Sequence, residues 1–288
     1  MRAYAKIDSE QLSIPLDSGI DLEEVERKAW YKIKSENKKG NAEVIYHTSR
    51  ECGRYNAERT TYKKQMEKKK EKLKEVGVTM LKSVKVTRVD VCFDFDTEFM
   101  EMFKLNDCIR GLYRLEYKER DSSTILSERL RKATSMMVNT RHNELYIYDK
   151  AHESMGNHLY KTRIEFRYKD IRVDEKTKLQ DLMKLLDGVI GNFEAFEKQR
   201  IKDLYEWYKE DEEKGIVHSF SEFVRHNEGY ITTSAICKGL YELVGMKSRY
   251  DRWLTEYKKV NDIEFATKTD VKKLLAELKR ALKEYIKG

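Results

Sequence analysis

The sequence predicts an α+β protein in which a mixed or antiparallel central sheet carries the functional site, with flanking helices and a C-terminal helical region. Two observations support this fold class. Three segments have the two-residue hydrophobic period of β-strands, and helical or irregular stretches separate them. After residue 170 the apolar residues instead recur at helical spacing, as in the run LQDLMKLLDGVIGNF.

The first part of the chain mixes short strands with helices. Strand-like segments are expected at 4–7 and 43–47, and a helix is expected over 22–34 with Asp21 as its N-cap. A lysine-rich helix is predicted over 57–75. Because this helix contains few apolar residues, we expect it to stand in solvent.

Three strand candidates follow at 83–96, 144–149 and 160–170, with a helix expected at 98–107 between the first two. In each strand, the two-residue period places apolar side chains on one face and mostly charged or polar side chains on the other. The polar faces carry Arg88, Asp90, Cys92, Asp94 and Asp96 in the first strand, Glu144, Tyr146, Tyr148 and Lys150 in the second, and Lys161, Arg163, Glu165, Arg167 and Lys169 in the third.

A charged run at 211–215 is expected to link two domains. Residues 1–212 are predicted to form the catalytic domain, and residues 213–288 a small helical domain. Within the helical domain, 233–258 has the helix, glycine turn and basic helix of a helix-turn-helix that binds duplex DNA. A plain helical hairpin fits the same pattern.

The 288-residue chain has 58 basic and 51 acidic residues and a net charge of +7. The segment 54–85 alone contains eleven Lys or Arg and four Glu. This excess favours a polyanionic partner such as nucleic acid, although lysine runs also occur on solvated helix faces. The four cysteines form no CxxC pair, and no apolar segment resembles a signal peptide or reaches the roughly 20 residues that cross a bilayer. We therefore expect a cytoplasmic protein without a membrane partner.

The acids of the first strand need a neutralising group, because adjacent carboxylates repel one another. If the three strands are neighbours, about 4.8 Å apart, their polar faces meet. Asp90, Asp94 and Glu165 would then offer hard oxygen ligands for Mg²⁺ or Mn²⁺, which polarise phosphoryl oxygens. The alternative is an ordinary antiparallel sheet with one face in water.

The second strand supplies a nucleophile of matching chemistry. A tyrosine hydroxyl has a pKa of about 10 and is a poor nucleophile at neutral pH, but a nearby cation such as Lys150 would lower that pKa. Attack on phosphorus would give a covalent phosphotyrosine. Arg88, Arg163 and Arg167 suit bidentate contacts with the flanking phosphates of DNA.

Three motifs, RVDVCFD at 88–94, LYIYDK at 145–150 and YKTRIEFRYK at 160–169, resemble in order and spacing those of rolling-circle replication initiators of the staphylococcal-plasmid type. Relaxases of integrative and conjugative elements share these motifs, and replication endonucleases of filamentous phages are distantly similar. The resemblance covers residues 80–170. The sequence has no His-hydrophobic-His triplet, so a histidine-ligated metal site is not expected.

The resemblance implies a site-specific, metal-dependent nickase that cuts one DNA strand and releases a 3′ hydroxyl for a polymerase. Tyr148 matches the nicking tyrosine, which keeps the 5′ end, and Lys150 follows it by two residues. Asp90, Asp94 and Glu165 match acids near the divalent metal. The family works with a host helicase and often as a dimer.

Three points remain open. Tyr146 stands where the family usually has arginine, so Tyr146 is either a second candidate nucleophile or a base-stacking residue. A conjugative relaxase uses the same chemistry as a replication initiator. A sheet with Tyr146 and Tyr148 beside arginines also suits a non-catalytic protein that binds single-stranded nucleic acid.

Overall fold

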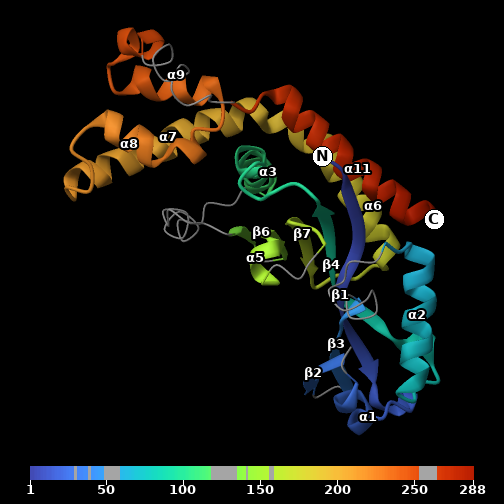
Figure 1. The fold of residues 1–288 in the computed structure, drawn as a ribbon. Helices are drawn as coiled ribbons and strands as arrows, with labels where there is room; N and C mark the ends of the chain where they lie inside the picture. Colours follow the sequence, from blue (N-terminus) through green and yellow to red (C-terminus); the bar gives the residue numbers. More distant parts are fainter. Residues whose placement is uncertain are drawn as a thin grey trace. The chain divides into compact units, whose positions relative to one another are not determined.

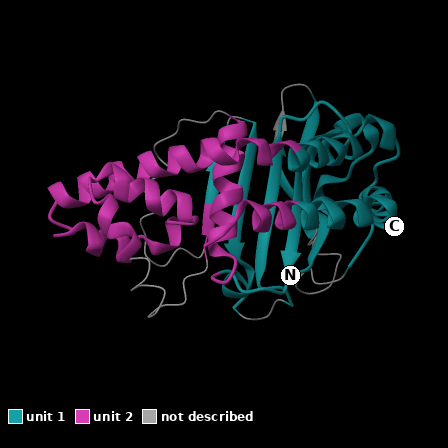
Figure 2. Cartoon of the chain, turned by 90° about the horizontal axis from the view of Figure 1, so that it is seen from above, with its two compact units in different colours: residues 1–99, 137–187, 276–288 teal, residues 100–136, 188–275 magenta. Residues whose placement is uncertain are grey.

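The computed structural model describes residues 1–28, 31–37, 40–48, 59–117, 135–140, 142–155, 159–252 and 265–288 (Figure 1). The chain forms two compact units, and each unit is built from separate segments of the sequence (Figure 2). Unit 1 consists of Met1–Phe99, Met137–Asp187 and Ala276–Gly288, and unit 2 consists of Met100–Met136 and Gly188–Leu275.

The fold class is α+β with a central antiparallel sheet, as predicted. The strands are β1 (Ala3–Pro15), β2 (Tyr31–Asn37), β3 (Asn41–Tyr46), β4 (Lys85–Phe95), β5 (Ser135–Asn139), β6 (Asn143–Asp149) and β7 (Thr162–Lys169). In the described residues these seven strands form one sheet in the order β2-β3-β1-β4-β7-β6-β5. The pairs with a defined register run antiparallel.

The helices are divided between the two units. Unit 1 contains α1 (Leu22–Arg27), α2 (Tyr62–Glu75) and α5 (Lys150–Glu153), and α6 (Glu175–Gly188) ends at its boundary. Unit 2 contains α3 (Phe103–Glu116), α7 (Phe193–Glu213), α8 (Phe220–His226) and α9 (Ser234–Leu243), while α11 (Lys268–Lys287) begins in unit 2 and ends in unit 1. Short 3₁₀ helices lie at Leu16–Ser18, Leu81–Ser83, Val189–Asn192 and Glu228–Tyr230. Within the described part of the chain, no helix combines the length and apolar character needed to cross a membrane.

The three strands that the hydrophobic period predicts are β4, β7 and β6, and β7 lies between the other two. Their apolar faces are buried: Phe93 of β4 packs edge-to-face against Phe166 of β7, with ring centroids 5.8 Å apart. β1 extends to Pro15, well beyond the predicted segment 4–7. Its longer course arises because its second half pairs with β3 as well as β4.

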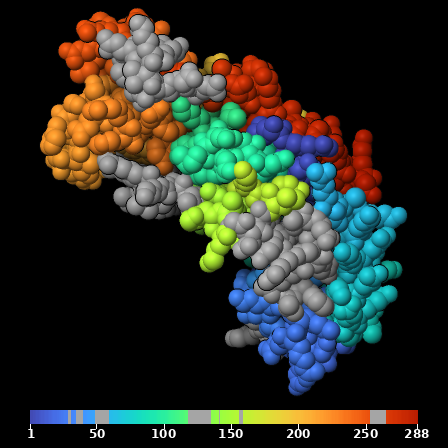
Figure 3. Space-filling view, viewed as in Figure 1, coloured from blue at the N-terminus to red at the C-terminus, as the bar shows by residue number. Residues whose placement is uncertain are grey.

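The lysine-rich helix α2 lies at the surface of unit 1, where Figure 3 shows its residues in cyan. The expectation that it stands in solvent is wrong for one face. Leu73 is buried in the hydrophobic core, and the ammonium group of Lys69 is buried between Glu10 of β1 and Glu175 of α6. The buried ion pairs of Lys69 therefore help to hold α2 against β1 and α6. In most surface helices a stripe of apolar side chains makes this contact.

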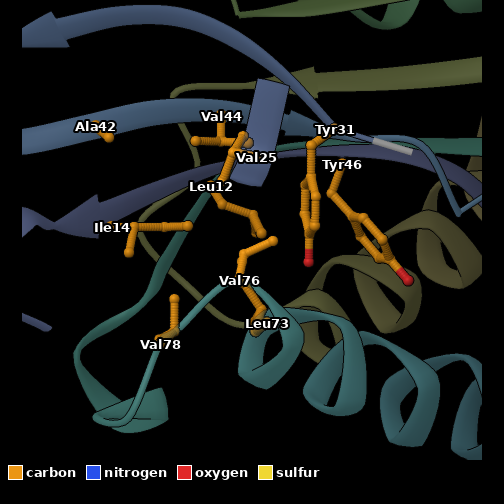
Figure 4. Packing of buried hydrophobic residues seen from close by; sticks show 10 residues of the cluster. All are labelled: Leu12, Ile14, Val25, Tyr31, Ala42, Val44, Tyr46, Leu73, Val76 and Val78. Atoms are coloured by element: carbon orange, nitrogen blue, oxygen red, sulfur yellow. The ribbon is translucent and has the colours of Figure 1, made fainter. Parts of the chain in front are cut away.

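One hydrophobic core fills the space between the β1–β3 part of the sheet and the helices α1 and α2 (Figure 4). Its side chains come from strands and helices far apart in the sequence. The buried residues are Leu12, Ile14, Val25, Tyr31, Ala42, Val44, Tyr46, Leu73, Val76 and Val78. Tyr31 of β2 and Tyr46 of β3 pair across the two strands with ring centroids 5.3 Å apart.

Two predicted helices have different boundaries in the structure. Asp21 is an N-cap as predicted, and its Oδ1 accepts a hydrogen bond from the Glu24 amide at 3.0 Å. However, α1 ends at Arg27 and the chain then forms β2, so the expected helix over 22–34 is wrong in its second half. The segment YKIKSE alternates apolar and polar residues, and pairing with β3 decides in favour of a strand. The helix expected at 98–107 is α3, which begins at Phe103.

The boundaries of the units differ from the division at residue 212 expected from the sequence. The charged run at 211–215 is not an extended linker, because α7 continues through Glu213 and ends in a turn at Gly215 with a φ of 65°. The Asp211 carbonyl accepts a hydrogen bond from the Ile216 amide at 2.8 Å, which closes this turn. Charged residues such as glutamate and lysine have good helix propensity, so they extend the helix here.

The predicted helix-turn-helix is only partly described. α9 is followed by Gly245 in the left-handed conformation, with a φ of 71°, and residues 247–252 are helical. The remainder of the predicted second helix, 253–258, lies outside the described residues. The helix-turn-helix therefore stays a prediction.

Candidate active site

The polar faces of β4, β7 and β6 lie side by side, because the registers place their polar residues opposite one another. Directly opposite residues of neighbouring strands point to the same face of a sheet. Read from β4 to β6, the rows are Asp90, Arg167 and Glu144; Cys92, Glu165 and Tyr146; and Asp94, Arg163 and Tyr148. The structure therefore brings the acids, the tyrosines and the arginines of the predicted site to one face.

Asp94 is neutralised by two basic side chains. Arg163 forms a bidentate pair with it: Nε donates to Oδ1 at 2.5 Å and Nη2 donates to Oδ2 at 3.0 Å. The ammonium group of Lys6 lies 3.2 Å from Oδ2. Asp94 and Arg163 are 0% and 1% exposed, so the pair is closed off from water.

Asp90 is also surrounded by donors. Arg88 donates to its two oxygens at 3.0 Å and 2.8 Å, and the Ser9 hydroxyl donates to Oδ2 at 2.6 Å. Arg167 adds a third cationic contact, with Nε 3.1 Å from Oδ1. The carboxylates of β4 are thus neutralised by arginine without any bound ion.

The predicted metal-ligand set of Asp90, Asp94 and Glu165 does not fit this arrangement. A cation at Asp90 or Asp94 would have to displace the guanidinium groups that already engage their oxygens. Among the described residues, no group of three or more His, Cys, Asp or Glu side chains is arranged to hold a metal ion. Glu165 remains the acid of the three that faces a tyrosine.

The arginines predicted to hold DNA phosphates are engaged with carboxylates. Arg167 donates from Nη1 to Glu144 at 3.1 Å and from Nη2 to Glu165 at 3.0 Å. Arg88 is bound to Asp90, as described above. Arg163 is buried in its pair with Asp94, so it cannot reach a phosphate without breaking that pair.

Tyr148 and Glu165 form a hydrogen bond at the centre of the polar face. The Tyr148 hydroxyl donates to Glu165 Oε2 at 3.3 Å. The pKa of Glu165 is raised to about 7: burial is the largest cause, the negative charges of Asp8 and Asp90 contribute to the rise, and Arg163 and Arg167 oppose it. A carboxylate with a pKa near neutral pH is matched to the task of a general base.

The expectation that Lys150 lowers the pKa of Tyr148 is wrong. Burial raises the pKa of Tyr148 well above its usual range, the charges of Glu165 and Asp8 add to this, and Arg163 opposes it. The Lys150 ammonium lies 5.5 Å from the ring centroid but forms an ion pair with Glu153 in α5. Tyr148 is half-buried as a residue, so it is not sealed in the core.

Tyr146 has a different environment from Tyr148. Its hydroxyl donates to Glu144 Oε2 at 3.0 Å, and the Arg167 guanidinium lies 4.8 Å from its ring centroid. Burial and the Glu144 hydrogen bond raise the pKa of Tyr146 to about 12. Although burial raises the pKa of Glu144, hydrogen bonds from Lys169 and Tyr146 lower it overall. Glu144 is therefore a weaker base than Glu165.

Asp8 also lies in this cluster, although the sequence pattern did not predict it. The register of β1 against β4 shifts between Ile7 and Ser9, so Asp8 occupies a bulge. Arg163 Nη1 donates to Asp8 Oδ1 at 2.7 Å. Because the predicted strand ended at residue 7, no two-residue period could place Asp8, and only the bulge directs it towards Arg163.

Comparisons with known proteins give no family assignment. A scan against models of protein families finds no match to this chain. No curated protein matches its sequence either. The resemblance of the three motifs to replication initiators therefore stays a prediction.

Proposed function

We propose that this protein is a site-specific tyrosine DNA nickase and strand transferase that initiates rolling-circle replication of a plasmid or mobile element. A single observation carries the proposal: the hydroxyl of the half-buried Tyr148 donates a hydrogen bond to Glu165, a buried carboxyl whose pKa is about 7. A conjugative relaxase would use the same chemistry. The partners expected for either role are DNA that is single-stranded at the nick, a host helicase and a second copy of the chain.

The proposed reaction is a transesterification at phosphorus. The Tyr148 oxygen attacks the scissile phosphate, its proton moves to Glu165 Oε2, and the bond from phosphorus to the 3′ oxygen breaks. The leaving 3′ oxygen takes up a proton and becomes a free hydroxyl, while the 5′ end stays on tyrosine as a phosphodiester. Reversal of these steps rejoins the strand, so one site serves both cutting and ligation.

Mg²⁺ or Mn²⁺ is the cofactor we propose for this reaction. Arginine side chains engage both oxygens of Asp90 and of Asp94, whereas Arg167 engages Glu165 at Oε1, so Glu165 is the predicted ligand that fits best. Asp8, which accepts a hydrogen bond from Arg163 at Oδ1, would add a second carboxylate, and its negative charge raises the pKa of Glu165. Magnesium is commonly held by one or two carboxylates together with substrate phosphates. Such an ion would supply positive charge at the scissile phosphate.

Tyr148 is a better candidate nucleophile than Tyr146 because of the carboxyl beside each hydroxyl. Glu165 has a pKa of about 7 and can exchange a proton near neutral pH, whereas the pKa of Glu144 is lowered. The Tyr146 ring lies under the Arg167 guanidinium. That arrangement suits stacking on a nucleobase.

The proposal is tested by searching for the covalent adduct. The protein is incubated with Mn²⁺ and 3′-labelled single-stranded oligonucleotides that tile the DNA flanking its coding sequence. We expect a labelled protein band that survives boiling in detergent, is lost in Tyr148→Phe and persists in Tyr146→Phe. The opposite pattern would assign the nucleophile to Tyr146.

A non-catalytic single-strand-binding protein is the second candidate, favoured by the arginine over Tyr146. Tight binding of these oligonucleotides without any adduct, across all tiles and with either metal, would support that function and contradict the nickase.

A further inference from the structure

A pocket of about 130 Å³ in unit 1 lies at the start of β1, away from the Tyr148 hydroxyl. One buried water needs about 10–15 Å³, so this pocket has room for a ring-sized group. The residues that matter for its chemistry are Arg2, Tyr4, Ala5, Arg59, Tyr160 and Tyr285. Tyr160, the first residue of the third motif, lines this pocket, but the proposed transesterification does not use it.

One wall of the pocket is aromatic and cationic. The rings of Tyr4 and Tyr160 are in contact, with centroids 5.3 Å apart. The Arg59 guanidinium lies 3.9 Å from the Tyr4 ring centroid and donates to the Tyr4 hydroxyl at 2.5 Å. Arg2 lies 5.6 Å from the same ring. Aromatic rings beside arginines form the kind of surface on which nucleobases stack.

A second wall of the pocket is a piece of strand edge that no further strand covers. Residues 3–7 of β1 pair with β4 on one side only, because β3 pairs with β1 from Glu10 onwards. At this edge, side chains of α11 satisfy both main-chain groups of Ala3. The Ala3 amide donates a hydrogen bond to Glu277 at 2.6 Å, and Arg280 donates one to the Ala3 carbonyl at 3.0 Å. Gln65 of α2 satisfies the main-chain groups of Ile7, because its side chain accepts a hydrogen bond from the Ile7 amide and donates one to the Ile7 carbonyl.

Ala5 lies between Ala3 and Ile7, whose main-chain groups are hydrogen-bonded at this edge, and it lines the pocket. In a β-strand, alternate residues direct their amide and carbonyl groups to the same side, so Ala5 presents both groups to this edge as Ala3 and Ile7 do. Among the described residues, none is hydrogen-bonded to the Ala5 main chain at this edge. One donor and one acceptor therefore face the pocket.

We infer that this pocket binds a single nucleobase of the DNA strand. An added β-strand is disfavoured, because side chains already occupy the edge groups of Ala3 and Ile7 and leave one residue to pair. All nucleobases carry a donor and an acceptor side by side on the Watson–Crick edge, which matches the amide and carbonyl of Ala5. The ring stacks on the wall of Tyr4 and Tyr160, and Arg2 and Arg59 hold the adjoining phosphate.

The pocket lies on the same row of the sheet as Tyr148, so a base bound there would be close to the nick. This inference rests on the proposed function. Tyr4 pairs with Asp94, so Tyr4, Asp94, Arg163 and Tyr148 form one row across four strands. At a strand spacing of about 4.8 Å, the Tyr4 and Tyr148 backbones are roughly 14 Å apart. This spans about four nucleotides stacked 3.4 Å apart and fewer in an extended strand. The pocket is thus placed to read one base within a few nucleotides of the cut.

The test uses short oligo(dT) strands that carry one 2-aminopurine, moved along the strand one position at a time, and the uncleaving Tyr148→Phe protein. We expect fluorescence quenching and tight binding at one position, with Kd raised roughly 5- to 150-fold by Tyr4→Leu. Arg59→Gln, at an exposed side chain, should weaken binding in the same direction without risk to folding. Tyr205→Leu and Arg27→Gln are the matched controls outside the pocket, and neither should change Kd.

The two proposals fail in different ways. Equal quenching and affinity in Tyr4→Leu, Arg59→Gln and their controls would overturn the base pocket and leave the nickase standing. The same holds if no position is quenched in any variant. Quenching that depends on Tyr4 and Arg59, without any covalent adduct from the protein with Tyr148 intact, would support the pocket and overturn the nickase.

Discussion

Asp94 shows how neighbours, rather than residue type, decide the role of a carboxylate. The sequence suggested a metal ligand, but the structure places Asp94 in a buried pair with Arg163 and Lys6. Removing one partner of a buried ion pair leaves the other charge uncompensated in a medium that solvates it poorly. Asp94 is therefore a residue on which folding depends.

We expect Asp94→Ala to lower the free energy of unfolding by about 3–5 kcal/mol, because Arg163 would stay buried without its bidentate partner. Urea denaturation measures this change. Asp96→Ala is the matched control, since Asp96 is exposed just beyond the same strand, and it should change stability by less than about 0.5 kcal/mol. A variant at Asp94 that is as stable as the wild type but does not cut DNA would restore the metal-ligand interpretation.

Glu165 is the residue whose ionisation should control the reaction. The base must be deprotonated to accept the Tyr148 proton, so kcat/KM for adduct formation should rise with pH and be half-maximal near pH 7, the pKa of Glu165. Below that pH the carboxyl is protonated and the rate falls. Glu165→Gln should lower the rate about 100- to 10,000-fold and abolish this pH dependence.

Glu144→Gln is the control for this pH profile, because Glu144 lies on the same face beside the other tyrosine. Its midpoint should stay near that of the wild type. A divalent ion beside Glu165 favours the charged carboxylate, so the midpoint near pH 7 is expected at limiting Mn²⁺ and should move to lower pH as the Mn²⁺ concentration rises. A midpoint that responds to Glu144→Gln and not to Glu165→Gln would contradict our assignment of the base.

At the scale of elements, α2 combines a structural face with a solvent face. Its buried Lys69 binds Glu10 at 3.0 Å and also binds Glu175. Burial raises the pKa of Glu10 to about 7 in spite of the opposing charge of Lys69. Lys69 thus helps to hold the helix against unit 1, while exposed lysines on the other face of α2 remain available to a polyanion.

The exposed lysines of α2 should contribute to DNA binding through phosphate contacts. Each phosphate contact releases condensed counterions, so the slope of log K against log salt falls by roughly 0.9 for each lost contact with duplex DNA. We expect Lys64→Gln and Lys68→Gln each to reduce that slope by about this amount, measured by fluorescence anisotropy. Lys184→Gln on α6, where the side chain is 82% exposed, should leave it unchanged. Equal slopes in all variants would exclude α2 from the DNA interface.

Each of the two units is assembled from segments that are far apart in the sequence. The chain leaves unit 1 after Phe99, returns to it at Met137, leaves again after Asp187 and returns at Ala276. The last segment carries the second half of α11, whose Glu277 and Arg280 bond to Ala3 near the N-terminus. The two ends of the chain are therefore parts of one folding unit.

Deleting residues 276–288 should unfold unit 1 or lower its melting temperature sharply. Leu278 and Leu282 are both 0% exposed, and burying one leucine contributes about 1.5–3 kcal/mol to a domain whose net stability is about 5–15 kcal/mol. Calorimetry measures the effect, and removal of only the exposed residues 287–288 is the control. If the shortened chain keeps the wild-type melting temperature, the C-terminal segment does not belong to the core of unit 1.

The sequence by itself determined the strands at 83–96, 144–149 and 160–170 and the composition of their polar faces. Such alternation depends only on the local geometry of each strand, so it can be read without knowing what lies beside it. The helix expected over 22–34 was wrong at 31–34, where the residues alternate and pair with β3 as a strand. The strand predicted at 4–7 also ended before the bulge at Asp8, so the sequence did not predict that β1 continues through it.

Only the tertiary structure decided what each polar residue does. The sheet order places β7 between β4 and β6, and this order pairs Asp94 with Arg163 and brings Tyr148 to Glu165. Charge neutralisation and pKa depend on distances between groups that the sequence separates widely and on their burial. Periodicity is a local property and these interactions are not, so the faces were predictable and the partners across them were not.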